Sequence, residues 1–366
     1  MSLQAPFPWF GGKSRAAEQV WAALGDVDSY VEPFGGSIAL LLARPDEHRA
    51  KVETVNDSDG LLVNWWRAVR ADPGAVARWV DWPVTETDLI ARHLWLIERR
   101  GTITARLEAD PEWYDTQAAG WWVWGACAWI GSGWCSGKGP WRLVDGQVTR
   151  GTAGQGVNRK LPHLGDAGRG VNRQLPHLGD AGQGVKRQLP HLGDAGRGVN
   201  RQIPHLGNAG RGVNRQLPHL GNAGQGVQLS LLDGRGPVRD WFVELAARLR
   251  RVRVTCGDWR RVTTSSVVER HGTAGVVLDP PYPEGWDPDR AYAGQDQTAA
   301  EICRDVFAAA AELADRGVRV VVCGYDGTWT PPDGWSSRRW LARKGYARTQ
   351  DQSRREILWC SPTCLP

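Results

Sequence analysis

Apolar residues recur along the chain in two spacings, which predict strands alternating with helices. Short apolar runs of the kind found in buried strands occupy residues 29–32, 51–55, 252–255, 274–278 and 318–323, with a last one at 355–359. Between these runs, apolar residues recur with the spacing of helices at residues 16–24, 38–42, 61–66, 238–251 and 299–313. Because buried strands that alternate with helices form mostly parallel sheets, the pattern predicts a Rossmann-like α/β fold.

This alternation is interrupted between residues 67 and 228. Residues 65–150 are rich in tryptophan and carry amphipathic helical spacing, for example at 87–97. They end in a glycine-punctuated stretch, residues 130–142, that predicts a loop or hairpin with an aromatic and basic tip. We therefore divide the chain into an α/β domain of residues 1–66 and 229–366 and a helical and hairpin insertion of residues 67–228.

A 14-residue unit repeats five times within the insertion, from residue 156 to residue 225. The five repeats hold ten Lys or Arg and three Asp, a net charge of +7, whereas the whole chain has +5, which leaves −2 for the remainder. Positive charge gathered in one segment suggests a polyanionic partner. A passive spacer is the main alternative, and metal binding by the one histidine of each repeat is a weaker one.

Composition indicates a soluble, cytoplasmic protein without a bound metal. No uncharged stretch is long enough to span a bilayer, and residues 1–6 lack the basic and apolar regions of a signal peptide. The seven cysteines are scattered, with no Cys-x-x-Cys pair and no histidine at zinc-ligand spacing. Buried thiols in a reducing compartment account for them best.

The first half of the α/β pattern predicts a nucleoside site. The strand at 29–32 ends in Glu32 and leads into a turn with Gly35 and Gly36, where the absence of Cβ atoms lets a ligand approach the backbone. Asp57 follows the second strand at the distance of a ribose-binding acid. The turn lacks the Gly-x-Gly-x-x-Gly of a dinucleotide site, which favours a ligand without phosphate over a nicotinamide cofactor.

The strand at 274–278 ends in Asp279-Pro280-Pro281-Tyr282, a sequence suited to activating an aromatic amine. The lone pair of an adenine amine is delocalised into the ring. A carboxylate from Asp279 that accepts one N–H, with the Pro280 carbonyl accepting the other, would free that lone pair to attack a sulfonium methyl group. Tyr282 would stack on the base and hold it for attack.

These segments together resemble the Dam-like family of adenine-specific DNA methyltransferases of phages and restriction–modification systems. The resemblance covers about residues 5–66 and 229–361. It rests on Trp9-Phe10-Gly11-Gly12-Lys13, on Glu32-Pro33-Phe34-Gly35-Gly36, on Asn56-Asp57-Ser58-Asp59, on Gly257-Asp258-Trp259 and on Asp279–Tyr282. It implies that S-adenosylmethionine is the methyl donor and duplex DNA the substrate, with the target base flipped out of the helix.

The same resemblance implies roles for individual residues. Trp9 and Lys13 would line the cofactor site, together with Glu32, Phe34, Gly35 and Gly36 of the glycine motif. Asp57 would bind the ribose, with Asp59 as the alternative, and the Asp258-Trp259 element would receive the adenine of the cofactor. Asp279, Pro280 and Tyr282 would be catalytic. Residues 1–66 and 229–366 would form the catalytic domain, and residues 67–228 would recognise the target.

Other acceptors and other classes of protein remain open at this point. Cytosine amine methyltransferases usually carry Ser in place of Asp279 and glutamine methyltransferases carry Asn, so Asp279 favours adenine, in DNA or in RNA. A DNA-binding module with an inactive methylase fold is a second class, and a dehydrogenase is a third. We expect a monomer, and a cognate restriction endonuclease is a candidate partner.

Overall fold

The computed structural model describes residues 3–9, 11–48, 50–129, 134–135, 237–282, 298–340 and 355–366, and the backbone of 141–144 and 147–150. The five repeats at 156–225, and with them most of the predicted insertion beyond residue 129, lie outside the described residues. None of the described helices is both long enough and apolar enough to cross a membrane.

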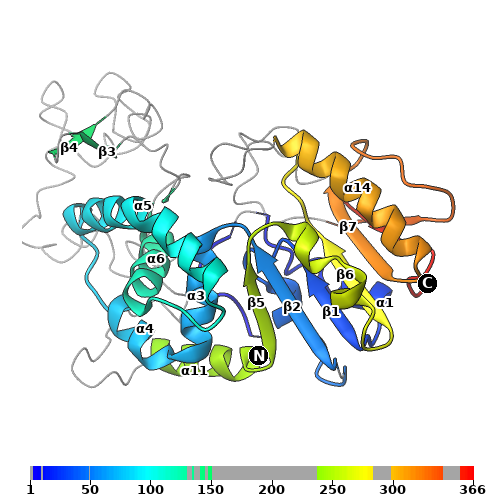
Figure 1. Cartoon of the computed structure of the whole chain (residues 1–366), viewed down its shortest axis with the longest axis horizontal. Helices are drawn as coiled ribbons and strands as arrows, with labels where there is room; N and C mark the ends of the chain where they lie inside the picture. Colours follow the sequence, from blue (N-terminus) through cyan, green and yellow to red (C-terminus); the bar gives the residue numbers. More distant parts are fainter. Residues whose placement is uncertain are drawn as a thin grey trace, which may run out of the picture.

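The centre of the molecule is a seven-stranded, mostly parallel sheet, as the alternating pattern predicts (Figure 1). Its strands lie in the order β5-β2-β1-β6-β7-β9-β8, and only β9 runs against its neighbours. Their bounds are β1 Ser29–Glu32, β2 Val52–Asp57, β5 Val252–Cys256, β6 Ala274–Leu278, β7 Arg319–Tyr325, β8 Ser336–Arg339 and β9 Glu356–Cys360. The pattern of apolar residues predicted every one of these strands except β8, whose sequence is Ser-Ser-Arg-Arg.

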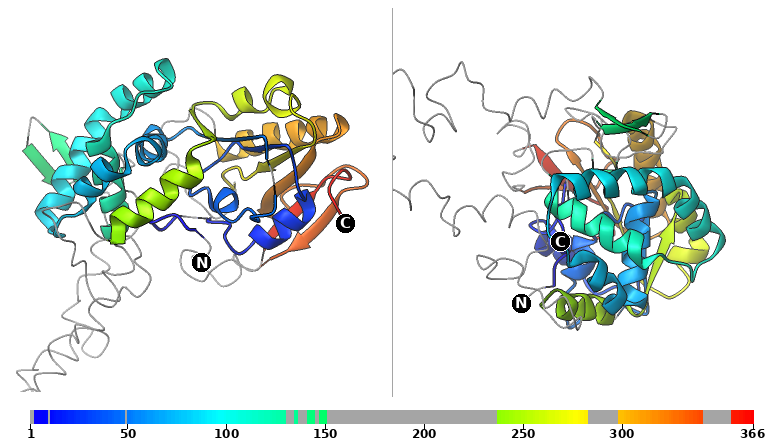
Figure 2. Two further views of the ribbon diagram at one scale, coloured as in Figure 1. Left: turned by 90° about the horizontal axis from the view of Figure 1, so that it is seen from below. Right: turned by 90° about the vertical axis from the view of Figure 1, so that its left-hand side faces the viewer.

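Helices cover both faces of the sheet, because successive side chains of its strands point to opposite sides. In β1, Tyr30 packs with α1 (Ala17–Leu24) and α2 (Ala39–Leu42), whereas Val31 packs with α12 (Ser265–Val268) and α14 (Ala299–Asp315) on the other side. Seen from below, α1 and α14 lie on opposite faces of the sheet (Figure 2). A short 3-10 helix, η4 (Trp259–Val262), joins the α12 and α14 side.

A group of helices extends the molecule beyond the edge strand β5 (Figures 1 and 2). It contains α3 (Gly60–Ala71), α4 (Pro73–Val80), α5 (Glu86–Ala109), α6 (Thr116–Ala128) and α11 (Pro237–Leu249). A two-stranded antiparallel hairpin of β3 (Trp141–Val144) and β4 (Gln147–Arg150) follows in the chain. The hairpin begins at the end of the stretch where the sequence predicted a loop or hairpin.

These helices share one hydrophobic core with the sheet. Buried side chains of α5 and α6, such as Leu96 and Trp122, belong to the same cluster as Tyr30 of β1. Arg67 of α3 joins the parts directly: its Nε donates to the Val254 carbonyl of β5, and its Nη1 donates to the Leu107 and Asp110 carbonyls at the end of α5. Among the described residues, these helices and one face of the sheet therefore pack around a common core, while the other face of the sheet has a core of its own.

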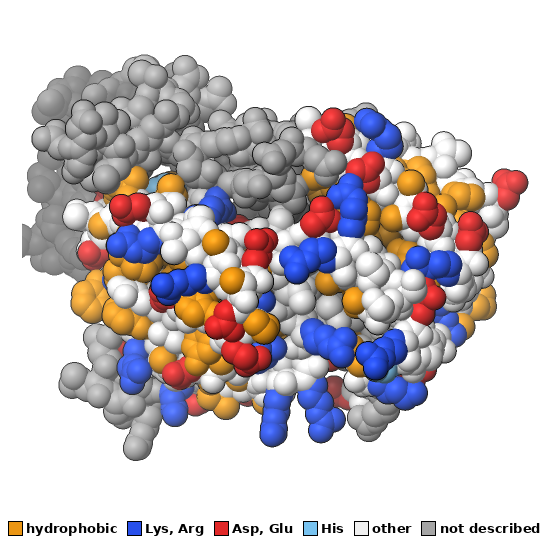
Figure 3. All heavy atoms as spheres, viewed as in Figure 1, with side chains coloured by type: hydrophobic (Ala, Val, Ile, Leu, Met, Phe, Trp, Pro, Cys, Tyr) orange, Lys and Arg blue, Asp and Glu red, His pale blue; other side chains and the backbone are white. Residues whose placement is uncertain are grey.

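Hydrophobic side chains also reach the surface of the helical part. On the face in Figure 3, they gather over α4 and its neighbours. The exposed large hydrophobic residues include Trp79 and Trp82, of which Trp82 is 53% exposed. The aromatic side chains of residues 67–129 therefore do not all lie in the core.

Candidate functional site

A pocket opens at the carboxyl ends of β1 and β6, where the strand order reverses direction. The chain proceeds outward from β1 to β2 and β5 on one side and from β6 to β7 on the other. Such a switch point is where open α/β sheets bind ligands. The pocket has a volume of about 640 Å³, including space open to solvent, and is lined by Trp9, Gly11, Gly12, Lys13, Glu32, Phe34, Gly35, Gly36, Ser37, Ala39, Asp57, Asp279, Pro280, Pro281, Tyr282, Tyr325 and Glu356.

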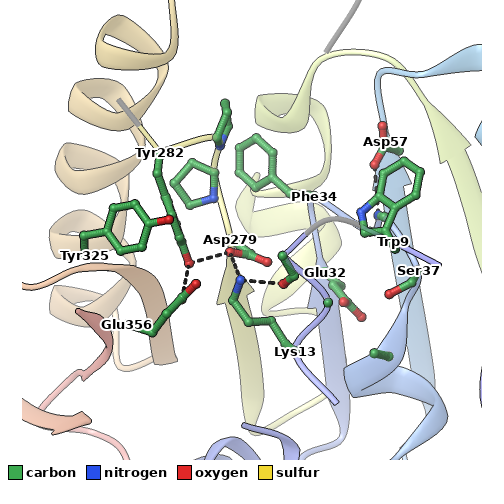
Figure 4. A pocket seen from close by; sticks show the side chains of 17 residues that line it. Trp9, Lys13, Glu32, Phe34, Ser37, Asp57, Asp279, Tyr282, Tyr325 and Glu356 are labelled. Carbon is green, nitrogen blue, oxygen red and sulfur yellow. Dashed lines mark hydrogen bonds and ion pairs between the residues drawn. The ribbon is translucent and has the colours of Figure 1, made fainter. Parts of the chain in front are cut away.

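Lys13 occupies the centre of the pocket floor (Figure 4). Its ammonium group lies 2.9 Å from Asp279 Oδ1 and donates a hydrogen bond of 2.8 Å to the Gly11 carbonyl. The side chain is only 4% exposed. Burial by itself lowers the pKa of Lys13, but the charges of Asp279 and Glu356 outweigh it and raise that pKa above its ordinary value. Lys13 is therefore a permanent cation that joins the N-terminal loop to the Asp279 turn.

Tyr282 contacts the same carboxylate oxygen of Asp279 and is almost fully buried. Its hydroxyl group is 3.1 Å from Asp279 Oδ1 and 3.3 Å from Glu356 Oε2 (Figure 4). Its ring packs edge-on against Tyr325, with ring centres 4.6 Å apart, and the Lys13 ammonium lies 5.1 Å from the ring centre. Burial and the two neighbouring carboxylates raise the pKa of Tyr282, so its hydroxyl group stays protonated and donates.

Glu32 ends strand β1 and faces the same pocket. Its carboxyl group is buried and accepts a hydrogen bond of 3.1 Å from the Tyr30 hydroxyl group. Burial raises the pKa of Glu32 to about 8, with a contribution from the charge of Asp279. A carboxyl group with such a pKa near neutrality is characteristic of functional sites.

Asp57, at the end of β2, also lines the pocket. Its two carboxylate oxygens accept the backbone N–H groups of Gly36 and Asp59, both at 2.9 Å. Burial raises the pKa of Asp57 to about 6 despite these hydrogen bonds. The carboxylate thus connects the end of β2 to the glycine turn after β1.

Asp59, the alternative to Asp57, has a different position. Its side chain caps the N-terminus of α3 by accepting the Leu61 N–H at 3.0 Å, and it forms an ion pair of 2.9 Å with Arg100 of α5. Asp59 does not line the pocket. The structure therefore favours Asp57 as the acid that faces a ligand.

The glycine turn is shaped by packing as well as by ligand access. Gly36 has a positive φ of 50°, and a Cβ atom there would lie 2.3 Å from Nε1 of Trp9. At Gly35, a Cβ atom would lie 3.2 Å from the Asn56 carbonyl. The indole of Trp9 therefore covers the turn, which adds a reason for glycine that the sequence did not reveal.

Asp258 and Trp259 follow β5 and are not among the pocket-lining residues. Asp258 caps η4 by accepting the Arg260 N–H at 2.7 Å, and its carboxylate pairs with the Arg260 guanidinium at 2.9 Å. Trp259 is buried and its ring packs on Phe34, with ring centres 5.8 Å apart. Trp259 thus supports a pocket residue, and the cofactor contacts expected of both residues stay predictions.

No family model matches this chain, and no curated protein matches it. A functional assignment therefore rests on the residues of the pocket and on their geometry.

Glu356 and Tyr325 are pocket residues that the sequence reasoning missed. Tyr325 ends β7, and Glu356 begins β9, the antiparallel strand beside it. Glu356 is only 5% exposed. The position of Glu356 at the start of a strongly apolar strand could have indicated a site residue, because an acid is seldom buried without a partner.

The pocket has an excess of acidic side chains. Four carboxyl groups line it (Glu32, Asp57, Asp279 and Glu356) against the one ammonium group of Lys13, an excess of three acids. The pKa values of Glu32, Asp57 and Glu356 are all raised, first by burial. Ionised carboxylates are thus costly here, and a bound cation would lower that cost.

Proposed function

We propose that this protein is an S-adenosylmethionine-dependent methyltransferase that acts on the N6 amine of adenine in duplex DNA. The observation that carries the proposal is the contact between Lys13 and Asp279 in a pocket that also holds Glu32 and Asp57. Motifs that are distant in the sequence converge there at the switch point of the sheet.

The chemistry of the pocket fits the methyl donor. The two carboxylate oxygens of Asp57 have four lone pairs between them, and the backbone N–H groups of Gly36, Asp59 and Ser58 use three, so one acceptor position is left for a ribose hydroxyl group. Glu32 and the excess of acids suit the positive sulfonium and ammonium groups of S-adenosylmethionine. When bound, S-adenosylmethionine supplies a methyl group on a positive sulfur, which a neutral nitrogen attacks as the carbon–sulfur bond breaks.

In this proposal, Asp279 activates the amine. Its described partners, Lys13 and Tyr282, both use Oδ1, and within the described part of the chain no hydrogen bond or ion pair reaches Oδ2. Oδ2 is therefore available to accept one N–H of an adenine amine, with the Pro280 carbonyl as acceptor for the other. The amine lone pair becomes available for attack. Once N6 carries the methyl group, its extra proton passes to the Asp279 carboxylate and from there to solvent, and the electrons of the broken carbon–sulfur bond stay on the sulfur.

Transfer of radiolabelled methyl groups to duplex DNA, followed by nucleoside analysis, tests the proposal. We expect label in N6-methyladenine from the wild type and a loss of at least about a hundredfold in rate for Asp279→Ala. Asp315→Ala, which removes an exposed carboxylate from the end of α14, is the matched control and should keep the wild-type rate.

Two results would contradict the proposal. Label in RNA but not in DNA would make RNA the substrate. Tight DNA binding without transfer to any base would indicate an inactive DNA-binding module.

The finer assignments follow from the same proposal. We assign residues 67–228 to target recognition, with helices α4–α6 and the β3–β4 hairpin as its described elements, and we propose that the protein is cytoplasmic. Sequencing of methylated DNA would identify the target sequence and so test the first assignment.

A further inference from the structure

Two carboxylate groups lie within hydrogen-bond distance of the Tyr282 hydroxyl group, beside the proposed reacting centre. The Tyr282 hydroxyl group is 3.1 Å from Asp279 Oδ1 and 3.3 Å from Glu356 Oε2 (Figure 4). A protonated tyrosine has one O–H to donate. The two carboxylates come from different elements, since Asp279 follows β6 and Glu356 begins β9.

The two acceptors, Asp279 and Glu356, differ in how accessible they are to a ligand in the pocket. Asp279 is 24% exposed toward the pocket, where a ligand can reach it. Glu356 is 5% exposed, and its pKa is raised by burial and by the charge of Asp279, against the opposing effect of Lys13. Glu356 is thus an acceptor held in the wall of the pocket.

In the proposed reaction, Asp279 accepts a hydrogen bond from the substrate. When its carboxylate accepts the N–H of a substrate amine, its charge is shared with a new donor and its hold on the Tyr282 hydroxyl group weakens. A buried hydroxyl group is destabilised when the hydrogen bond to its acceptor weakens, unless a second acceptor is within reach. Without a second acceptor, the Tyr282 ring, which contacts Tyr325 and the Lys13 ammonium, would be held less firmly in its orientation.

We infer that Glu356 is a positioning residue that holds the Tyr282 hydroxyl group while Asp279 engages the substrate amine. The inference rests on the proposed function and deepens it, because it assigns a role to a strand that the resemblance does not single out. The role assigned to Glu356 is to act through Tyr282 and not directly on the reacting atoms.

Two substitutions of Glu356 separate hydrogen bonding from packing. Glu356→Met keeps the length of the side chain but removes the acceptor, and Glu356→Gln keeps an acceptor oxygen while removing the charge. We expect Glu356→Met to lower kcat for DNA methylation about tenfold, with KM for S-adenosylmethionine near that of the wild type. We expect Glu356→Gln to restore most of the lost rate.

The same substitution in a Tyr282→Phe background tests whether Glu356 acts through the hydroxyl group. Phenylalanine keeps the ring and has no proton to hold, so Glu356→Met should cause no further loss of kcat there. Glu312→Met, on the exposed face of α14, is the control for introducing methionine. Thermal unfolding of each variant identifies any that fails to fold.

The outcomes distinguish the inference from the proposed function. A wild type that transfers no methyl group to adenine overturns both. An active wild type whose kcat is insensitive to Glu356→Met overturns the inference alone. So does an equal loss of kcat with and without the Tyr282→Phe substitution, or a failure of Glu356→Gln to restore the rate when both variants are folded.

Discussion

Individual side chains in the pocket are held in states that differ from those of free amino acids. Glu32 has a pKa of about 8 and Asp57 of about 6, in both cases because burial disfavours the ionised carboxylate. Lys13 remains charged in spite of its burial, because Asp279 and Glu356 face it. The site therefore contains one fixed cation and several acids whose ionisation responds to what binds.

The raised pKa of Glu32 predicts a pH dependence of stability. Its ordinary value of 4.5 applies to the unfolded chain, so the folded protein holds this proton more tightly. That contribution to stability is fully present below about pH 4.5 and is lost as the pH rises through about 8. We expect the free energy of unfolding to fall between these values, by up to about 1 kcal/mol for each pH unit, and to fall less in Glu32→Gln.

Urea unfolding at a series of pH values measures this slope. Glu312→Gln, an exposed acid on α14, serves as the control and should keep the slope of the wild type. A slope that is the same in Glu32→Gln as in the wild type would show that Glu32 is ionised in the folded protein at neutral pH.

At the scale of elements, the end of a strand and the start of a helix determine the different contacts of Asp57 and Asp59. Asp57 and Asp59 are two residues apart at the junction of β2 and α3. One closes the glycine turn and faces the pocket, and the other caps α3 and pairs with Arg100. The sequence left the two open as ribose ligands, because spacing alone does not show where a helix begins.

These different positions predict different effects of substitution: loss of stability for Asp59 and loss of cofactor binding for Asp57. Asp59→Ala removes a helix cap and an ion pair, so we expect a loss of about 1–2 kcal/mol in the free energy of unfolding, with binding of S-adenosylmethionine close to that of the wild type. Asp57→Asn should weaken that binding at least about tenfold. Urea unfolding and isothermal titration calorimetry measure the two effects, and the reverse assignment of phenotypes would make Asp59 the ligand.

Strand β8 shows where pattern reasoning fails for an element. Its four residues, Ser-Ser-Arg-Arg, are polar and mostly exposed, so no apolar period marks them. They form a strand because β9 offers its unpaired edge, through pairs such as Arg338 with Leu358. The reversed direction of β9 brings its first residue, Glu356, beside the end of β7 and into the pocket.

At the scale of the whole molecule, charge is distributed unevenly along the chain. Residues 156–225 carry a net charge of +7, whereas the rest carries −2. If these repeats contact DNA phosphates, each contact releases counterions and steepens the dependence of affinity on salt. The passive spacer remains the alternative.

Replacement of residues 156–225 by an uncharged Gly/Ser segment of equal length distinguishes the two. We expect weaker DNA binding and a shallower plot of log affinity against log salt, by about 0.9 for each phosphate that the repeats neutralise. The rate of methyl transfer at saturating DNA should stay near that of the wild type, because the residues proposed for catalysis and for cofactor binding lie outside the repeats in the sequence. Fluorescence anisotropy at several salt concentrations provides the measurement, and an unchanged affinity and slope would identify a spacer.

The sequence by itself determined the local elements and the chemistry at their ends. The spacing of apolar residues and the glycine turns mark the buried strands and the residues that follow them. They therefore predict the strands β1, β2, β5, β6, β7 and β9 and the pocket residues Lys13, Glu32, Asp57 and Asp279. Only the tertiary structure decided which of these residues meet. The ion pair of Lys13 with Asp279, the contact of Glu356 with Tyr282, and the turn of Asp258 toward Arg260 depend on strand order and on packing between distant segments. No local spacing encodes such contacts, because they form only when the sheet assembles and brings those segments together.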